Sequence, residues 1–162
     1  MTDTYKNIHS WVDPVNGDRT PYLQLPCDFL KEKAFLDLPY AARIFYIVLC
    51  VHKESAEQQA CLEGTLTKYN EIFGLGMNEH DIQCEARPYK KTSKYTNGNM
   101  FVIPESQQEK YGFSSQYASK LKKILEDRGF IEVVYAKKGK YDGWSKNVTV
   151  YKFSNKWKSK ST

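Results

Sequence analysis

Residues 112–135 read GFSSQYASKLKKILEDRGFIEVVY, and this stretch decides which fold the sequence predicts. Phe113-Ser114-Ser115 forms a turn that supplies an N-cap serine, because a serine oxygen accepts a hydrogen bond from a free N–H group at a helix start. The helix runs to about Arg128 and is stopped by Gly129. The β-branched and aromatic residues that follow, Phe130–Tyr135, predict a strand.

The elements on either side complete a recognisable order. They are a short apolar strand, a short helix opened by Pro104, and a further strand, over Met100–Ile103, Glu105–Tyr111 and Val148–Phe153. The loop before the last strand, Ala136–Asn147, holds two glycines and four lysines. Strand, helix, tight turn, helix and a hairpin with a basic loop is the order of a winged helix-turn-helix. We therefore predict an α+β fold with a helical core, a small antiparallel sheet and a basic wing hairpin.

The helix after the turn has two different faces. At about 100° per residue, its apolar side chains fall in one arc, formed by Ala118, Leu121 and Leu125 and extended by Ile124 and Tyr117. The opposite arc holds Gln116, Ser119, Lys120 and Lys123. The apolar arc should pack the helix onto the domain and force the polar arc outward. An ordinary amphipathic surface helix would show the same lysines opposite the core, so this helix alone does not indicate DNA binding. The elements that flank it are what favour DNA binding.

The outward side chains have the chemistry to read DNA. Glutamine can bind adenine through two hydrogen bonds and serine can contact several base edges, so we predict Ser115, Gln116 and Ser119 as base readers. Lys120, Lys122 and Lys123 should hold phosphates, which position the domain without specifying sequence. The wing adds cations that would lie against the DNA backbone or enter the minor groove, namely Lys137, Lys138, Lys140 and Lys146.

The charge of the chain is unevenly distributed. Residues 1–85 hold 7 Lys and Arg against 13 Asp and Glu, whereas residues 86–162 hold 17 against 6. This asymmetry indicates that the C-terminal half meets a polyanion, and double-stranded DNA fits best because each phosphate neutralised by Lys or Arg releases condensed counterions. The alternative is a basic face that is merely solvated.

The N-terminal part of the sequence is less regular. Residues 1–21 are polar and should form a loose arm. Tyr22–Leu25 predicts a short strand. A helix should follow over Leu38–Lys53, with Asp37 as its N-cap and Pro39 in its first turn. Because its apolar residues cover nearly every face, we expect this helix to be buried centrally.

A single winged-helix domain is predicted over residues 22–157, with an insertion at about 54–99 and a basic tail at 158–162. Within the insertion, Thr65 or Thr67 could cap a short helix closed by Gly74. Further on, lysines interleave with tyrosines, a pattern that can bind a phosphate backbone or form a solvated loop; these residues are Tyr89, Lys90, Lys91, Lys94 and Tyr95.

Several other classes of protein are disfavoured. The sequence has no phosphate-binding G-x-x-x-x-G-K-[ST] loop and no H-E-x-x-H or G-x-S-x-G motif, so we expect neither an enzyme nor a cofactor. The four cysteines are spread without a common zinc spacing, and free thiols are favoured over a metal site. The longest nearly unbroken apolar run, the eleven residues Ala41–Val51 interrupted only by Arg43, is too short to cross a bilayer. No secretory signal begins the chain, so we expect a cytoplasmic protein that does not bind membranes.

The sequence resembles one family in two places. Tyr22–Pro26, Ala34–Leu38 and Ala42–Tyr46 look like the opening of the N-terminal winged-helix domain of plasmid and mobile-element replication initiators. The stretch Gly112–Glu132 resembles the recognition helix of that family and the strand after it, and more loosely those of winged-helix regulators of the MarR type. The resemblance covers most of residues 22–157 and implies sequence-specific DNA binding.

Three functions follow as hypotheses. The first is a replication initiator of a plasmid or mobile element, with replication or transcription proteins as further partners. The second is a transcriptional regulator with the same fold. The third is a protein-protein interaction module that presents its acidic N-terminal half or an aromatic surface, because a fold does not fix a function. Binding to palindromic or repeated DNA sites would imply a homodimer.

Overall fold

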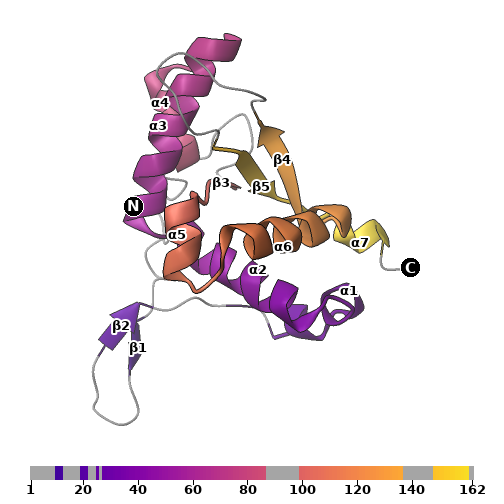
Figure 1. The fold of residues 1–162 in the computed structure, drawn as a ribbon. Coiled ribbons are helices and arrows are strands. Elements are labelled where there is room, and N and C mark those ends of the chain that lie inside the picture. The colour runs from indigo at the N-terminus through magenta and orange to yellow at the C-terminus, as the bar shows by residue number, and fades with distance from the viewer. Residues whose placement is uncertain are drawn as a thin grey trace.

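The computed structural model describes residues 10–12, 19–21, 25, 27–86, 99–136 and 148–160 (Figure 1). In chain order the elements are β1 (Ser10–Val12), β2 (Arg19–Pro21), the 3-10 helix η2 (Phe29–Lys31), α1 (Lys33–Leu36), α2 (Tyr40–Lys53), α3 (Ala56–Phe73), α4 (Glu79–Ala86), β3 (Met100–Phe101), α5 (Glu105–Lys110), α6 (Ser115–Asp127), β4 (Ile131–Tyr135), β5 (Val150–Phe153) and α7 (Trp157–Lys160). The chain thus has the α+β fold that the sequence predicts.

A three-stranded antiparallel sheet lies at the centre of the fold. Its strand order is β3-β5-β4, so the last strand of the chain lies between the other two. The register pairs Phe101 with Tyr151 and Val133 with Tyr151, and an irregularity follows between Val133 and Tyr135. A separate antiparallel pair, β1 and β2, occupies part of the region where the sequence predicts a loose arm. The strand predicted over Tyr22–Leu25 falls outside the described residues except for Leu25, which is in no strand.

Helices cover both faces of the sheet because successive strand residues point to opposite sides. Phe101 and Ile103 join the cluster made by α2, α6 and α7, whereas Met100 and Val102 join the cluster made by α3 and α4. Figure 1 shows α6 running between the sheet and α2, with α3 and α4 grouped on another side of the sheet, next to β3. Residues 56–86, predicted as part of an insertion, therefore form one of the two layers that bury the sheet.

The two ends of α6 form as the sequence predicts. The Ser114 hydroxyl accepts a hydrogen bond from the Tyr117 N–H at 3.3 Å, which satisfies one free donor at the helix start. At the other end, Gly129 adopts a φ of 84°, a left-handed conformation that glycine reaches without steric cost. The Phe130 N–H then donates to the Leu125 carbonyl at 2.9 Å and turns the chain toward β4.

Helix α2 differs from its prediction in two respects. It begins at Tyr40 with Pro39 at the N-cap position, and Asp37 instead ends α1, where it pairs with Lys33 at 2.7 Å. The helix is also not buried on all sides. Phe45 and Leu49 are fully enclosed, but the opposite side exposes apolar residues, with Tyr40 at 78%, Ile44 at 57% and Val51 at 43%. The apolar residues that suggested central burial therefore form two faces, and only one of them is covered in the described part of the chain.

Helix α3 is longer than the short helix predicted for this region. It begins after Ser55, whose hydroxyl accepts a hydrogen bond from the Gln58 N–H at 3.1 Å, so neither Thr65 nor Thr67 is its cap. Both threonines lie inside the helix. Its end is correctly predicted, because Gly74 adopts a φ of 59°. Among the described helices, α3 included, none is long and apolar enough to cross a membrane.

Candidate nucleic-acid interface

Helix α6 separates its side chains as the sequence predicts, with one exception. Ala118, Leu121 and Leu125 are buried against the core. The opposite arc is exposed and consists of Gln116, Ser119, Lys120 and Lys123. Tyr117, which the helical wheel placed beside the apolar arc, is 46% exposed and stacks on Phe113 at a centroid distance of 6.3 Å. The exposed arc is therefore bordered by an aromatic side chain at the helix start.

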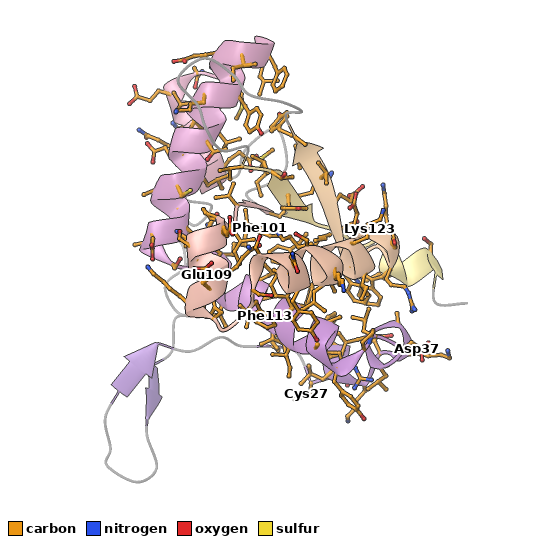
Figure 2. All side chains as sticks on the ribbon, viewed as in Figure 1. Cys27, Asp37, Phe101, Glu109, Phe113 and Lys123 are labelled. Carbon is orange, nitrogen blue, oxygen red and sulfur yellow. The ribbon has the colours of Figure 1, made fainter. Side chains whose placement is uncertain are left out.

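The exposed arc lies on an accessible side of the molecule. Lys123 is exposed, and Figure 2 shows it toward the end of α6 beside β4, whereas Phe113 lies at the start of the helix next to α2. Phe113 packs against Phe45 of α2 with ring centroids 4.9 Å apart, which fixes the start of α6 on the core. Because this end is anchored, the direction of the Gln116 and Lys120 side chains is set by the helix and not by a mobile loop.

Two of the three lysines on α6 already have partners. Lys123 lies 3.2 Å from Asp127, and this hydrogen bond raises the pKa of the lysine. Both groups are exposed, so the pair contributes little to stability and its lysine can exchange the carboxylate for a phosphate. Lys120 is also exposed, and it forms no ion pair with any other described residue. It is therefore the most available cation of the arc.

Lys122 has a different environment. Its ammonium lies 5.7 Å from the centre of the Tyr151 ring on β5, within the range of a cation–π contact. Burial lowers the pKa of Lys122, while the nearby Glu105 carboxylate raises it. Together with Ser115 and Ser119, Lys122 lines a cavity between α6 and β5. Three predicted DNA contacts thus border this cavity, and of these only Ser119 also belongs to the exposed arc.

The preceding helix, α5, attaches to the core through polar side chains. Gln107 and Gln108 are buried, although each leaves its side-chain oxygen without a hydrogen-bond partner among the described residues. Lys110 pairs with Glu57 of α3 at 2.9 Å. The helix sequence, with no apolar residue, gave no signal that two glutamines would be enclosed. Gln108 in particular was not predicted as a site residue, yet it lines the same cavity as Lys122.

The remaining predicted cations are not placed by the structure. The wing residues Lys137, Lys138, Lys140 and Lys146 lie outside the described residues, as do Lys90, Lys91 and Lys94. Near the ends of the sheet, Lys152 and Lys156 both pair with Glu132, the former at 3.6 Å. These contacts lower the pKa of Glu132, with the hydrogen bond from Lys156 as the largest cause. Part of the positive charge at this edge is therefore neutralised within the fold.

The histidines and cysteines that the structure describes do not gather into a site. His52 is buried, and its Nε2 lies 2.9 Å from the carbonyl oxygen of Val102, which is a contact between α2 and the segment after β3. His80 and Cys84 lie 3.6 Å apart on α4. Within the part of the chain that the structure describes, no group of three or more His, Cys, Asp or Glu residues could hold a metal ion.

No protein-family model, no curated protein and no solved structure matches this chain. The chemistry of the site therefore follows from its own side chains. These are an exposed arc with hydrogen-bonding groups at the start of α6, cations further along it, and a polar cavity beside it.

Proposed function

We propose that this chain is a winged-helix protein that binds double-stranded DNA in a sequence-specific manner and acts in the replication of a plasmid or mobile element. In this proposal α6 is the recognition helix and the segment Ala136–Asn147 is the wing. The protein works in the cytoplasm by binding alone, without catalysis or a cofactor. Replication proteins are its further partners.

The order of the elements supports this assignment. Strand β3 is followed by α5, a tight turn and α6, and the chain then enters β4 and returns along β5 to complete the sheet. Gly112 in the turn has a φ of 85°, and the N–H of Phe113 donates to the Gln108 carbonyl at 3.1 Å. This is the arrangement expected of a helix-turn-helix followed by a hairpin.

The observation that carries the proposal is the exposed arc of α6. Gln116 and Ser119 lie in the first turns of the helix, where this kind of motif contacts base edges. Lys120 and Lys123 follow within one further turn and could reach the adjacent phosphates. The arc thus combines groups that can distinguish bases with groups that bind any DNA, and the apolar face of the same helix holds both in a fixed direction.

The experiment is a selection of DNA fragments by the full chain, followed by affinity measurements on the selected site and on an unrelated duplex. Lys120→Ala should weaken binding to both duplexes by a similar factor, because a phosphate contact carries no sequence information. Gln116→Ala should weaken binding to the selected site by roughly 5- to 100-fold and reduce the preference over the unrelated duplex. A selected site with two-fold symmetry would indicate a homodimer.

Lys68→Ala provides the matched control, because Lys68 is an exposed lysine on α3, whose apolar face covers the other side of the sheet. Its removal should leave DNA affinity unchanged apart from the small effect of one net charge. If Lys120→Ala and Lys68→Ala have the same effect, the proposed orientation of α6 on DNA is wrong.

The same geometry serves a transcriptional regulator equally well. The two roles differ in where the selected site lies, since an initiator selects repeats within a replication origin and a regulator selects sequences at a promoter. Mapping the selected fragments onto the source genome distinguishes them.

A protein-protein interaction module is the second candidate, and the exposed face of α2 favours it. Tyr40, Ile44 and Val51 place apolar side chains on one surface of that helix. Apolar surface of this kind can mark a contact with another protein. Retention of the chain on heparin or DNA resin would favour DNA binding, whereas retention by a specific protein alone would favour this alternative.

A further inference from the structure

A cavity of about 300 Å³ opens between α5, α6 and β5. This size is at the lower end of the range typical of small-molecule sites. Its polar lining comes from α5, α6 and the residue before β5, and includes Gln108, Ser115, Ser119, Lys122 and Thr149. The ring of Tyr151 forms part of the apolar wall. Hydrogen-bond donors and acceptors therefore converge on one partly open cavity.

The donor side of the cavity carries positive charge. Lys122 is partly buried, and the Tyr151 ring is the partner that the structure gives its ammonium. The hydroxyls of Ser115 and Ser119 lie on the same side of α6 as Lys122, and Ser115 is the first residue of that helix. The N-terminal end of a helix carries partial positive charge. An anion in the cavity would thus meet an ammonium, two hydroxyls and a helix start.

The acceptor side has an unsatisfied group. Gln108 is only 3% exposed, and its side-chain oxygen has no hydrogen-bond partner among the described residues. A buried polar oxygen of this kind normally has a partner, which can be a ligand or a water molecule. Less than 1 Å² of this oxygen is accessible, so the Gln108 side chain would have to turn toward the cavity for a ligand to reach it. The Glu105 carboxylate lies at the exposed rim of the same cavity and would also accept a hydrogen bond. A ligand that suits both sides is an anion that also carries hydrogen-bond donors.

We propose that this cavity binds the phosphoryl group of a small phosphorylated ligand, with the phosphoryl oxygens on Lys122, Ser115 and Ser119 and a donor of the ligand toward Gln108. A phosphoryl group suits this lining better than a carboxylate because it offers three acceptor oxygens to the several donors around it. The phosphoryl group could belong to a free phosphate ester or to the backbone of DNA. Binding of a free ester does not depend on the DNA-binding function proposed above.

The test uses the full chain and follows amide resonances by NMR during titration with adenosine 5′-monophosphate, inorganic phosphate, adenosine or a short duplex. If the bound phosphoryl group belongs to a free ester, adenosine 5′-monophosphate shifts the resonances of α5 and the start of α6 at lower concentration than inorganic phosphate does. Adenosine, which lacks the phosphoryl group, leaves them unchanged. Shifts of the same residues with the duplex alone assign the phosphoryl group to nucleic acid. The absence of shifts at these residues with every phosphorylated probe overturns the proposal.

Two variants check that the cavity is responsible. Lys122→Gln should weaken binding of the effective probe by about tenfold or more, which is the loss expected for one charge-assisted hydrogen bond. The control is Lys123→Gln on the exposed arc, which should not weaken the binding of adenosine 5′-monophosphate. Gln108→Met keeps the side-chain volume and removes an amide whose oxygen has no partner among the described residues. The chain should therefore fold and lose the preference for the nucleotide over inorganic phosphate. Equal binding by the original chain and Lys122→Gln also overturns the proposal.

Discussion

The Lys122 ammonium lies 5.7 Å from the centre of the Tyr151 ring, so a cation of α6 is directed onto β5 instead of into solvent. Its neighbour Lys123 is exposed and pairs with Asp127 on the outer side of the same helix. Adjacent residues of a helix are about 100° apart, which places these two lysines in different environments. The three lysines of α6 are therefore not equivalent, although the sequence suggests one basic face.

Asp127→Asn should strengthen DNA binding if the proposed function is correct. The substitution releases Lys123 from its carboxylate and removes one negative charge from the exposed side of α6. We expect affinity for any duplex to rise by roughly two- to fivefold at low salt, because an exposed ion pair contributes no more than about 1 kcal/mol. Fluorescence anisotropy with a labelled duplex measures the change.

Asp37→Asn is the matched control for this prediction. Asp37 pairs with Lys33 at 2.7 Å through the same four-residue spacing, but on α1. The two variants have the same net charge, so a general charge effect would change DNA affinity equally in both. An increase confined to Asp127→Asn supports α6 as the DNA-binding helix, and equal increases would contradict it.

Gly129→Ala should destabilise the fold more than Gly112→Ala does. Both glycines have left-handed φ angles, 84° and 85°, so each substitution costs about 1–2 kcal/mol of backbone strain. A Cβ on Gly129 would also lie 2.7 Å from the backbone nitrogen of Trp157, whereas a Cβ on Gly112 would meet nothing within 4 Å. Urea denaturation should show the larger loss of unfolding free energy for Gly129→Ala. Equal losses would mean that α7 does not pack as described.

Stability should fall as the pH drops below about 6.5, and His52 should cause part of this fall. Burial lowers its pKa from the ordinary value of 6.5, so the unfolded chain takes up the proton first. The stability that neutral His52 contributes is fully present above pH 6.5 and is lost as the pH falls toward the lowered pKa of the folded state. His52→Gln retains a donor for the Val102 carbonyl and should flatten the pH dependence in this window. Glu57 and Glu132 have pKa values lowered from 4.5 and act only at more acidic pH.

The two faces of α2 should respond differently to truncation. Leu49 is fully buried, so Leu49→Ala should cost about 2–5 kcal/mol of unfolding free energy. Ile44 is 57% exposed, and Ile44→Ala should change the unfolding free energy by less than about 1 kcal/mol. Thermal or urea denaturation of the two variants gives the comparison. A large loss with Ile44→Ala would show that this face is covered in solution.

The C-terminal elements could be predicted closely because residues at or near their ends determine their boundaries. Ser114 and Gly129 mark the ends of α6, and the apolar spacing of Ala118, Leu121 and Leu125 sets its buried face. The β-branched run after Gly129 specifies β4 in the same way. Such signals depend on neighbours within one or two turns and do not need the rest of the chain.

Other features depend on distant contacts and could not be predicted. Residues 56–73 form one helix that packs on Val102, just after β3, and on Val150 of β5, although the helix sequence has weak periodicity. The burial of Gln108 and the partly enclosed position of Lys122 likewise require α5, α6 and β5 to be assembled. The α2 sequence showed apolar residues on all sides, and only the assembled fold shows which side is covered.

The most direct test of the central claim is the affinity of the full chain for duplex DNA across a series of salt concentrations. If Lys120, Lys123 and the four wing lysines each neutralise a phosphate, the logarithm of the binding constant should fall with the logarithm of salt concentration with a slope of about −5. Lys120→Ala should make that slope shallower by about 1. A flat response to salt, or a slope that Lys120→Ala does not change, would contradict DNA binding through the exposed side of α6.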